Sequence, residues 1–447
     1  MSAVMTNGLI DDKLEEWKET KIIGIIGLGD MGLLYAEMFS QAGWKVVCCD
    51  RPEKYDMLLK KYQGAKFTVL KDGHLVSRIS DYIIYSVETE NIKTIVSKYG
   101  PSTKLGAIVG GQTSCKNYEI KAFEEFLPTD VDIISVHSLH GPKVNTEGQP
   151  LVIIDHRSSR SDSYPFVRAL LSCLKSKIVD LTYEEHDTIT ADTQAVTHAA
   201  FLSMGLAWFK RRTYPWSIGV GQCNGGFENV KVNISLRIYS NKWHVYAGLA
   251  ISNPAAHKQI MQYAQSTTDI FTLFIEGKKA ELKSRVMEAK ECIFGNHSGP
   301  LLLEDAMLAN YSLSRQEICE DKIARCNSHL SLLAIVDSWH KLGVNPYDHM
   351  ICSTPLFRIF VGVTEYLFMD SGLLEQTINT AIEEDWFRAD DLEFVIAART
   401  WSQIVSSGCF ELYKTQFEEV QKFFEPMFPE ATKVGNDMIK MILKNQG

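Results

Sequence analysis

The chain has 447 residues, which is too many for one ordinary hydrophobic core, so two or three domains are expected. Apolar residues make up 45% of the chain and charged residues 23%, the proportions of a soluble globular protein. The net charge of −9 and the lack of a Lys/Arg-rich run argue against a nucleic-acid partner.

The first 20 residues carry acidic side chains where a secretion signal would need an apolar core, so 1–20 is predicted to be an N-terminal extension. No uninterrupted apolar stretch approaches the roughly 20 residues that cross a bilayer, which predicts no membrane partner. The ten cysteines are scattered and form no Cys-x-x-Cys. This distribution predicts reduced thiols in a cytoplasmic protein without a zinc module.

Short, β-branched apolar runs begin at residue 21 and predict strands that are buried on both faces. The runs are 22–26, 45–50, 81–87, 106–111, 131–136, 150–155 and 176–182. Helix candidates such as Asp30–Ala42 and Asn91–Tyr99 lie between the early ones. Strands that alternate with helices indicate an α/β domain with a doubly wound parallel sheet, predicted over 21–182.

Helical patterning dominates from Tyr183 to the end, and it contains a repeat. Residues 197–216 align without gaps on 328–347, so that His198 falls on His329 and Trp208 on Trp339. Farther on, SLRIY matches LFRIF, which pairs Arg237 with Arg358, and the first copy has a longer loop at 219–228. Two ordered blocks favour duplication of a helical unit. The predicted parts are a first helical domain (183–295), a linker (296–327) and a second helical unit (328–447).

A glycine motif, Gly27-x-Gly29-x-x-Gly32, follows the first strand and opens the first helix. Its glycines permit the tight turn, the approach of a pyrophosphate to the backbone and the close packing of helix on strand. An acid, Asp50, ends the second strand, as in dinucleotide-binding folds. The predicted cofactor-binding residues are Gly27, Leu28, Gly29, Asp30, Met31, Gly32, Asp50 and Arg51.

The choice between NAD and NADP stays open from these residues. Asp50 would accept hydrogen bonds from a ribose 2′-hydroxyl and repel a 2′-phosphate, which favours NAD. Arg51 follows at once, with Lys54 nearby, and an arginine there can pair with the 2′-phosphate. Asp50 could also turn away from the ribose.

Ligands of open α/β sheets bind beyond the carboxyl ends of the strands, where this sequence places several polar side chains. His137 follows strand 131–136, and Thr113, Ser114 and Lys116 follow strand 106–111. Imidazole suits a general base at neutral pH, and we predict that His137 takes a hydroxyl proton during hydride transfer. A structural hydrogen bond is the better interpretation of His140. A metal site would need a third ligand, for which His186 is the candidate, but nothing at metal-binding spacing supports it.

In chain order, the glycine motif, GGQTSCK (110–116), VHSLHG (136–141) and EEHD…DTQAVTH (184–198) resemble the motifs of prephenate dehydrogenases. The whole chain looks like the fungal branch of that family, whose members use NADP. The resemblance implies a Rossmann domain joined to a helical domain. It also implies oxidative decarboxylation of prephenate to 4-hydroxyphenylpyruvate and CO2 in tyrosine biosynthesis, with NADP as the hydride acceptor in preference to NAD.

The resemblance also implies roles for particular residues. His137 matches the catalytic histidine and Ser114 the serine that supports it. His198 matches a histidine that lines the substrate site, and Gln194 and Thr113 are expected there too. A family arginine for the substrate carboxylate falls on Gly248 here, which leaves that partner in doubt. The candidates for its place are Arg237, Arg358 and Lys258.

Three alternatives remain beside this expectation. An arogenate dehydrogenase would act on the amine in place of the keto acid. A β-hydroxyacid or 6-phosphogluconate type enzyme would need a glycine-rich lysine motif that 191–210 does not contain. A regulator that senses NADP without chemistry would not need Ser114 and His137 together. Helical domains pair between subunits in the family, so the duplication predicts either a homodimer or an internal pseudo-dimer.

Overall fold

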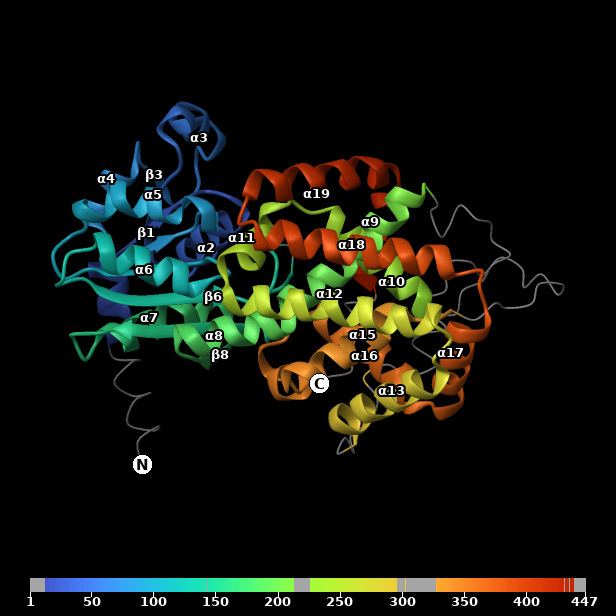
Figure 1. Ribbon diagram of the computed structural model, residues 1–447. Helices are drawn as coiled ribbons and strands as arrows, with labels where there is room; N and C mark the ends of the chain where they lie inside the picture. The colour runs from blue at the N-terminus through green and yellow to red at the C-terminus, as the bar shows by residue number, and fades with distance from the viewer. Residues whose placement is uncertain are drawn as a thin grey trace. The chain divides into compact units, whose positions relative to one another are not determined.

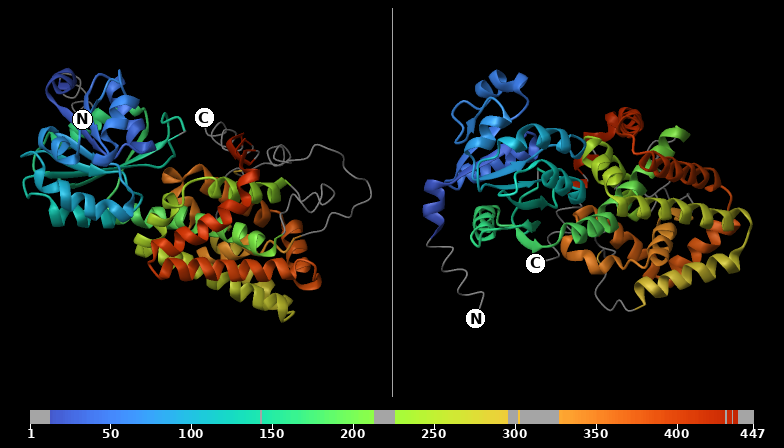
Figure 2. Two further views of the ribbon diagram at one scale, coloured as in Figure 1. Left: turned by 90° about the horizontal axis from the view of Figure 1, so that it is seen from above. Right: turned by 60° about the vertical axis from the view of Figure 1, so that its left-hand side comes forward.

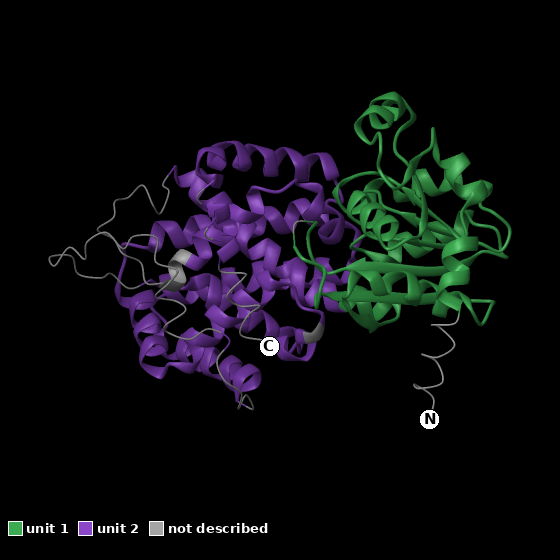
Figure 3. Cartoon of the chain, turned by 180° about the vertical axis from the view of Figure 1, so that it is seen from behind, with its two compact units in different colours: residues 1–188 green, residues 189–447 purple. Residues whose placement is uncertain are grey.

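The computed structural model describes residues 13–142, 144–212, 226–295, 302, 327–429, 431–433 and 435–437. The chain divides into two compact units, Met1–Thr188 and Ile189–Gly447 (Figure 3). The boundary falls within helix α8 (Tyr183–Thr190). Most of the longer loop of the first repeat copy and almost all of the predicted linker lie outside the described residues.

The first unit is built on one eight-stranded sheet with the order β3-β2-β1-β4-β5-β6-β7-β8. All seven predicted strands are present, within a few residues of their expected ends. The strands are β1 (Ile22–Ile26), β2 (Lys45–Cys49), β3 (Thr68–Val69), β4 (Tyr82–Tyr85), β5 (Ile108–Gly111), β6 (Asp132–Ser138), β7 (Pro150–Arg157) and β8 (Lys177–Asp180). The short edge strand β3 was not predicted, because two residues form no recognisable pattern.

One strand pair departs from the parallel arrangement. β6 and β7 are antiparallel, while every other pair in the sheet is parallel. Residues 139–149 join them without a helix, and a parallel return would need a longer crossover. The antiparallel pairing sets His137 opposite Val152.

Helices cover both faces of this sheet (Figure 2). One face packs against α2 (Asp30–Gln41) and α7 (Ser163–Leu171), and the other against α4 (Gly73–Ile79), α5 (Thr89–Tyr99) and α6 (Lys116–Phe126). Successive strand residues alternate between the two cores, so Ile84 faces the first and Ile83 the second. Burial on both faces explains the continuous apolar runs. The short helix α3 (Tyr55–Lys61) follows β2.

The second unit is helical throughout its described residues. A π-helix (Ala191–Ala195) leads into the first series: α9 (Val196–Arg211), α10 (Gly226–Tyr239), α11 (His244–Ser252), α12 (Pro254–Ile275) and α13 (Lys279–Phe294). The second series is α15 (Leu330–Leu342), α16 (Pro355–Met369), α17 (Ser371–Glu383), α18 (Arg388–Ser406) and α19 (Phe410–Phe424). Both series contribute to one continuous core.

The two series pack across each other. The first helix of each contacts the fourth helix of the other, α9 with α18 and α15 with α12, and the two fourth helices contact each other (Figure 1). The third helix of each series likewise contacts the fifth helix of the other, α11 with α19 and α17 with α13. Reciprocal contacts of this kind are those of an intertwined two-fold pair.

The copies differ where the two histidines lie. His198 is inside α9, whereas His329 precedes α15 with a left-handed φ of 47°. His329 donates its backbone N–H to Asn327 Oδ1, and its ring lies 3.1 Å from Lys231 Nζ. Among the described residues, no helix is long and apolar enough to cross a membrane.

Candidate active site

The glycine motif forms the turn between β1 and α2. Gly27 adopts φ = +109°, and a Cβ there would overlap the carbonyl oxygen of Ser86. A Cβ on Gly32 would overlap the carbonyl oxygen of Gly27, so helix and turn pack directly together. A Cβ on Gly29 would meet nothing within 4 Å. The backbone is therefore open beside Gly29 at the start of α2, where a pyrophosphate fits the helix N-terminus.

The carboxylate of Asp50 is engaged within the protein. Its Oδ2 accepts from Leu28 N at 3.0 Å, its Oδ1 accepts from Arg51 N at 2.7 Å, and Lys54 Nζ lies 3.0 Å away. Burial opposes ionisation of Asp50, but the amide hydrogen bonds and Lys54 outweigh it and hold the pKa of the carboxyl below its usual value. The Arg51 side chain remains 74% exposed.

His137 is the penultimate residue of β6, two residues farther along than the predicted strand end, and is 9% exposed. Its Nδ1 lies 2.7 Å from Nε2 of His186, and Nδ1 of His186 lies 2.8 Å from Oδ1 of Asp187. Both partners come from α8 and are buried. The Nε2 atom of His137 makes no hydrogen bond within the part of the chain that the structure describes.

Asp187 occupies the N-terminus of α6. Its Oδ1 accepts from Lys116 N at 2.7 Å and its Oδ2 from Asn117 N at 2.8 Å, while the thiol of Cys115 lies 3.6 Å from Oδ2. Burial works against its charge, yet His186 and the two amides lower the pKa of Asp187. The carboxylate is therefore ionised and fixed in place.

A buried ion pair lies beside this chain. Lys116 is 0% exposed, and its Nζ contacts Glu119 Oε1 at 2.8 Å, Val136 O at 2.8 Å, Gly111 O at 3.0 Å and Ser135 Oγ at 3.0 Å. Ser135 Oγ also bonds the Glu119 carboxylate. The network ties the ends of β5 and β6 to α6.

Both histidines are held neutral by their surroundings. Burial lowers the pKa of His137 well below its ordinary value, and the neighbouring His186 and Lys116 add to the effect. Burial also lowers the pKa of His186, against the opposing influence of Asp187. A neutral His137 is ready to accept a proton at neutral pH.

The other predicted residues of this edge lie apart from His137. Ser114 makes no hydrogen bond with His137 in the structure, so its supporting role stays a prediction. The Thr113 hydroxyl is engaged by Glu119 Oε2 at 2.7 Å and Cys115 O at 2.9 Å. His140 Nδ1 lies 3.0 Å from Gly141 O, a local hydrogen bond of the expected structural kind.

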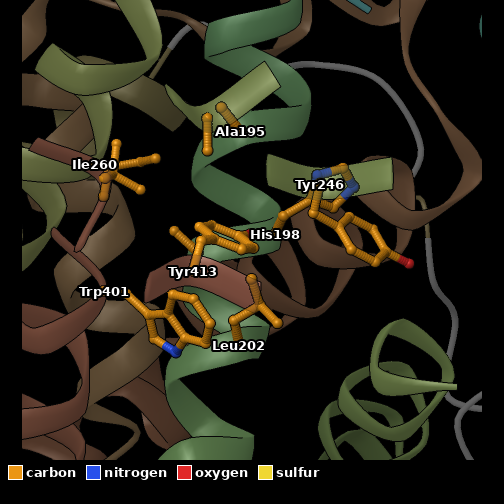
Figure 4. A pocket seen from close by; sticks show the side chains of 10 residues that line it. Ala195, His198, Leu202, Tyr246, Ile260, Trp401 and Tyr413 are labelled. Carbon is orange, nitrogen blue, oxygen red and sulfur yellow. The ribbon is translucent and has the colours of Figure 1, made fainter. Parts of the chain in front are cut away.

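His198 lines a small, mostly apolar pocket in the second unit (Figure 4). The other lining residues are Ala195, Ala199, Leu202, Tyr246, Ala250, Ile260, Trp401, Val405 and Tyr413. The ring of His198 meets Tyr246 edge-on, with centroids 4.7 Å apart. Burial lowers the pKa of His198 to about 3, and its buried Nδ1 has no hydrogen-bond partner among the described residues. Helices of both repeat copies thus line one pocket.

The π-helix before α9 places Gln194 beside this region of the chain. The amide nitrogen of Gln194 is buried without a partner among the described residues. Asp192 of the same π-helix bonds Gln259 and lies 3.2 Å from His349 Nε2. Single π-helical turns often occur at functional sites.

The cations considered for the substrate carboxylate have different surroundings. Arg237 bonds Asn436, and burial lowers its pKa although the neighbouring Tyr246 raises it. Arg358 donates to Ser353 Oγ at 2.6 Å and Met350 O at 2.8 Å. Lys258 is exposed on α12. Because Arg237 lies near Tyr246 of the His198 pocket, it is the best placed of the three.

The direct partners of His137 are not evident from the sequence. There His186 is a candidate only as a metal ligand and Asp187 has no role, although both belong to the quoted EEHD motif. No group of three or more potential metal ligands occurs among the described residues. The only signal for the pairing was that motif, because His137 and His186 are 49 residues apart.

Comparisons with known proteins agree with the motifs. Residues 195–444 match a family model described as a 6-phosphogluconate dehydrogenase C-terminal domain, and 22–109 match "NADP oxidoreductase coenzyme F420-dependent". The chain is 66% identical over 97% of both chains to a Saccharomyces cerevisiae protein named prephenate dehydrogenase [NADP(+)]. It is 57% identical to a Schizosaccharomyces pombe protein named probable prephenate dehydrogenase [NADP(+)], over 96% of this chain and 99% of that one. A crystal structure of prephenate dehydrogenase from A. aeolicus covers 60% of this chain and 96% of its own, with 16% identity and a TM-score of 0.48.

Proposed function

The chain belongs to the prephenate dehydrogenase family, and from this premise we propose that it oxidises and decarboxylates prephenate to 4-hydroxyphenylpyruvate and CO2 with NADP+. The observation that carries the proposal is the free Nε2 of His137 at the carboxyl end of β6, in the same unit as the glycine turn. A regulator that only sensed the cofactor would not need a buried, neutral imidazole there.

His137 acts as the general base in this reaction. Its Nε2 takes the proton of the ring hydroxyl, and the C4–O bond gains carbonyl character. When bound, NADP+ accepts the hydride from C4. The resulting ketone is conjugated to the carbon that bears the carboxylate, so the C–CO2 bond breaks and its electron pair makes the ring aromatic. Aromatisation makes the sequence effectively irreversible, and the protein need only orient the ring and hold the proton.

Three further residues complete the proposed site. His198 contacts the substrate as a neutral imidazole with a free Nδ1, and Gln194 can offer its unpartnered amide nitrogen. Arg237 is the proposed partner of the substrate carboxylate. Ser114 would assist at the same hydroxyl as His137, and Thr113 would contribute by holding Glu119 and the turn.

A direct assay tests this function. Purified protein with prephenate and NADP+ is expected to produce reduced nicotinamide, measured by its absorbance, faster than with arogenate or with NAD+. Faster turnover of arogenate would identify the alternative substrate. NADP binding without turnover of either substrate would contradict the enzymatic proposal and support the regulator.

Arg51 is the proposed determinant of NADP over NAD. Asp50 is engaged by Leu28 N, Arg51 N and Lys54, so its carboxylate is turned from the ribose, while the Arg51 guanidinium is exposed. Charge-assisted hydrogen bonds contribute roughly 1.5–3 kcal/mol, so Arg51→Gln is expected to weaken NADP binding about 10- to 100-fold. NAD binding, measured by calorimetry in parallel, should be unchanged. The exposed Arg78 provides a matched control as Arg78→Gln, and equal losses for both cofactors would contradict the assignment.

We also propose that the helical repeat is an internal pseudo-dimer. The crossed packing of α9 on α18 and α15 on α12 supports it, since each series is completed by the other. The chain should therefore sediment as a 50.5 kDa monomer at micromolar concentration. A species of twice that mass that persists on dilution would favour the homodimer instead. The free cysteines among the described residues agree with the predicted cytoplasmic location, which stays a prediction.

A further inference from the structure

The hydrogen bonds behind His137 fix the direction of every proton in the chain from Asp187 to His137. An ionised carboxylate can only accept, so Nδ1 of His186 carries the hydrogen that faces Asp187. A neutral imidazole has one N–H, which leaves Nε2 of His186 as an acceptor. His137 must then donate from Nδ1, and the lone pair of its Nε2 is left free.

We propose that His186 and Asp187 are positioning residues that hold His137 in the Nδ1–H tautomer and stabilise it after it has taken up a proton. This inference rests on the proposed function, in which His137 is the base. Asp187 is itself fixed by the amides of Lys116 and Asn117, so the orientation of the base is set by the N-terminus of α6.

The step balances without another reactant. The substrate O–H bond breaks, an N–H bond forms at Nε2 of His137, and the imidazolium keeps its Nδ1–H. The hydrogen bond from that Nδ1–H to His186 becomes charge-assisted and therefore stronger. Asp187 in turn favours the positive charge that develops on the two rings, as a buried carboxylate does behind a catalytic histidine.

Two substitutions at His186 separate positioning from packing. Leucine fills a similar volume but offers no acceptor to His137 Nδ1. Glutamine can place its amide oxygen near the position of Nε2 and accept that bond. We expect His186→Leu to lower kcat on the order of 10²-fold with KM and NADP affinity unchanged, and His186→Gln to recover most of the loss. His74, which bonds Ser102 Oγ at 2.8 Å away from these residues, serves as a control in His74→Leu, with kcat unchanged.

A spectroscopic readout tests the tautomer without turnover. In protein labelled with 15N-histidine at neutral pH, the His137 ring should show a protonated Nδ1 and an unprotonated Nε2. The signal is assigned by its loss in His137→Asn. His186→Leu should shift the ring toward the Nε2–H tautomer, and His186→Gln should restore the original pattern.

The outcomes separate this inference from the proposed function. Normal kcat in His186→Leu, or an unchanged tautomer, overturns the positioning role even if His137→Asn is inactive. Parallel losses of kcat, NADP affinity and melting temperature that glutamine does not repair would make His186 a packing residue only. If the wild-type protein turned over neither substrate but showed the expected tautomer shift, the proposed function would fail while the hydrogen-bonded chain remained.

Discussion

Replacement of His137 by asparagine is expected to lower kcat about 10²- to 10⁴-fold, because general-base catalysis typically contributes that much. Asparagine can keep the hydrogen bond that His137 makes to His186, but it has no basic nitrogen for the hydroxyl proton. The side chain lies at the end of β6, away from the glycine turn of β1, so NADP affinity should change little. Steady-state kinetics and cofactor titration measure the two quantities separately.

The control for this substitution is a histidine of the same unit that takes no part in the site. His74 packs edge-on against Tyr99, and His74→Asn should leave kcat unchanged. Turnover of His137→Asn within a few-fold of the wild-type rate would remove His137 as the base. A loss of NADP affinity equal to the loss of kcat would instead indicate that the substitution disturbs the fold of the unit.

Replacement of Lys116 by methionine is expected to destabilise the protein by about 3–5 kcal/mol, since it leaves the Glu119 carboxylate buried without its cation. Both side chains are 0% exposed, so water cannot replace the lost partner. Denaturant unfolding of the variant, followed by fluorescence, measures the change in the free energy of unfolding. The double variant with Glu119→Gln removes the unpaired charge and should recover part of the loss.

An exposed ion pair provides the comparison. Lys93 and Glu125 lie 2.8 Å apart, and both side chains are 51% exposed. Surface pairs contribute roughly 0–1 kcal/mol, so Lys93→Met should hardly change the unfolding midpoint. If Lys116→Met unfolded like Lys93→Met, the buried network would not be the link between α6 and the strand ends that its hydrogen bonds suggest.

Much of the nucleotide-binding unit follows from short stretches of sequence. The apolar runs predicted seven of the eight strands, because strands covered on both faces need continuous apolar residues. The glycine turn was predictable because Gly27 and Gly32 meet backbone atoms that leave no room for a side chain. The duplication was also visible, since both copies keep their residues in the same order.

The tertiary structure decided what depends on distant residues. Only it turned Asp50 toward Leu28 N, set β7 antiparallel to β6, and paired each repeat helix with the opposite copy. It also gave His137 a partner, His186, that motif order alone did not assign.

Local patterns determine elements because a strand, a turn or a helix is stabilised by neighbours in the chain. The protonation of His137 and the packing of α9 on α18 depend instead on groups that meet only when the chain has folded. The sequence by itself therefore determined the type of fold, the place for the cofactor and the identity of the base. The tertiary structure alone decided which nitrogen of that base is free to act.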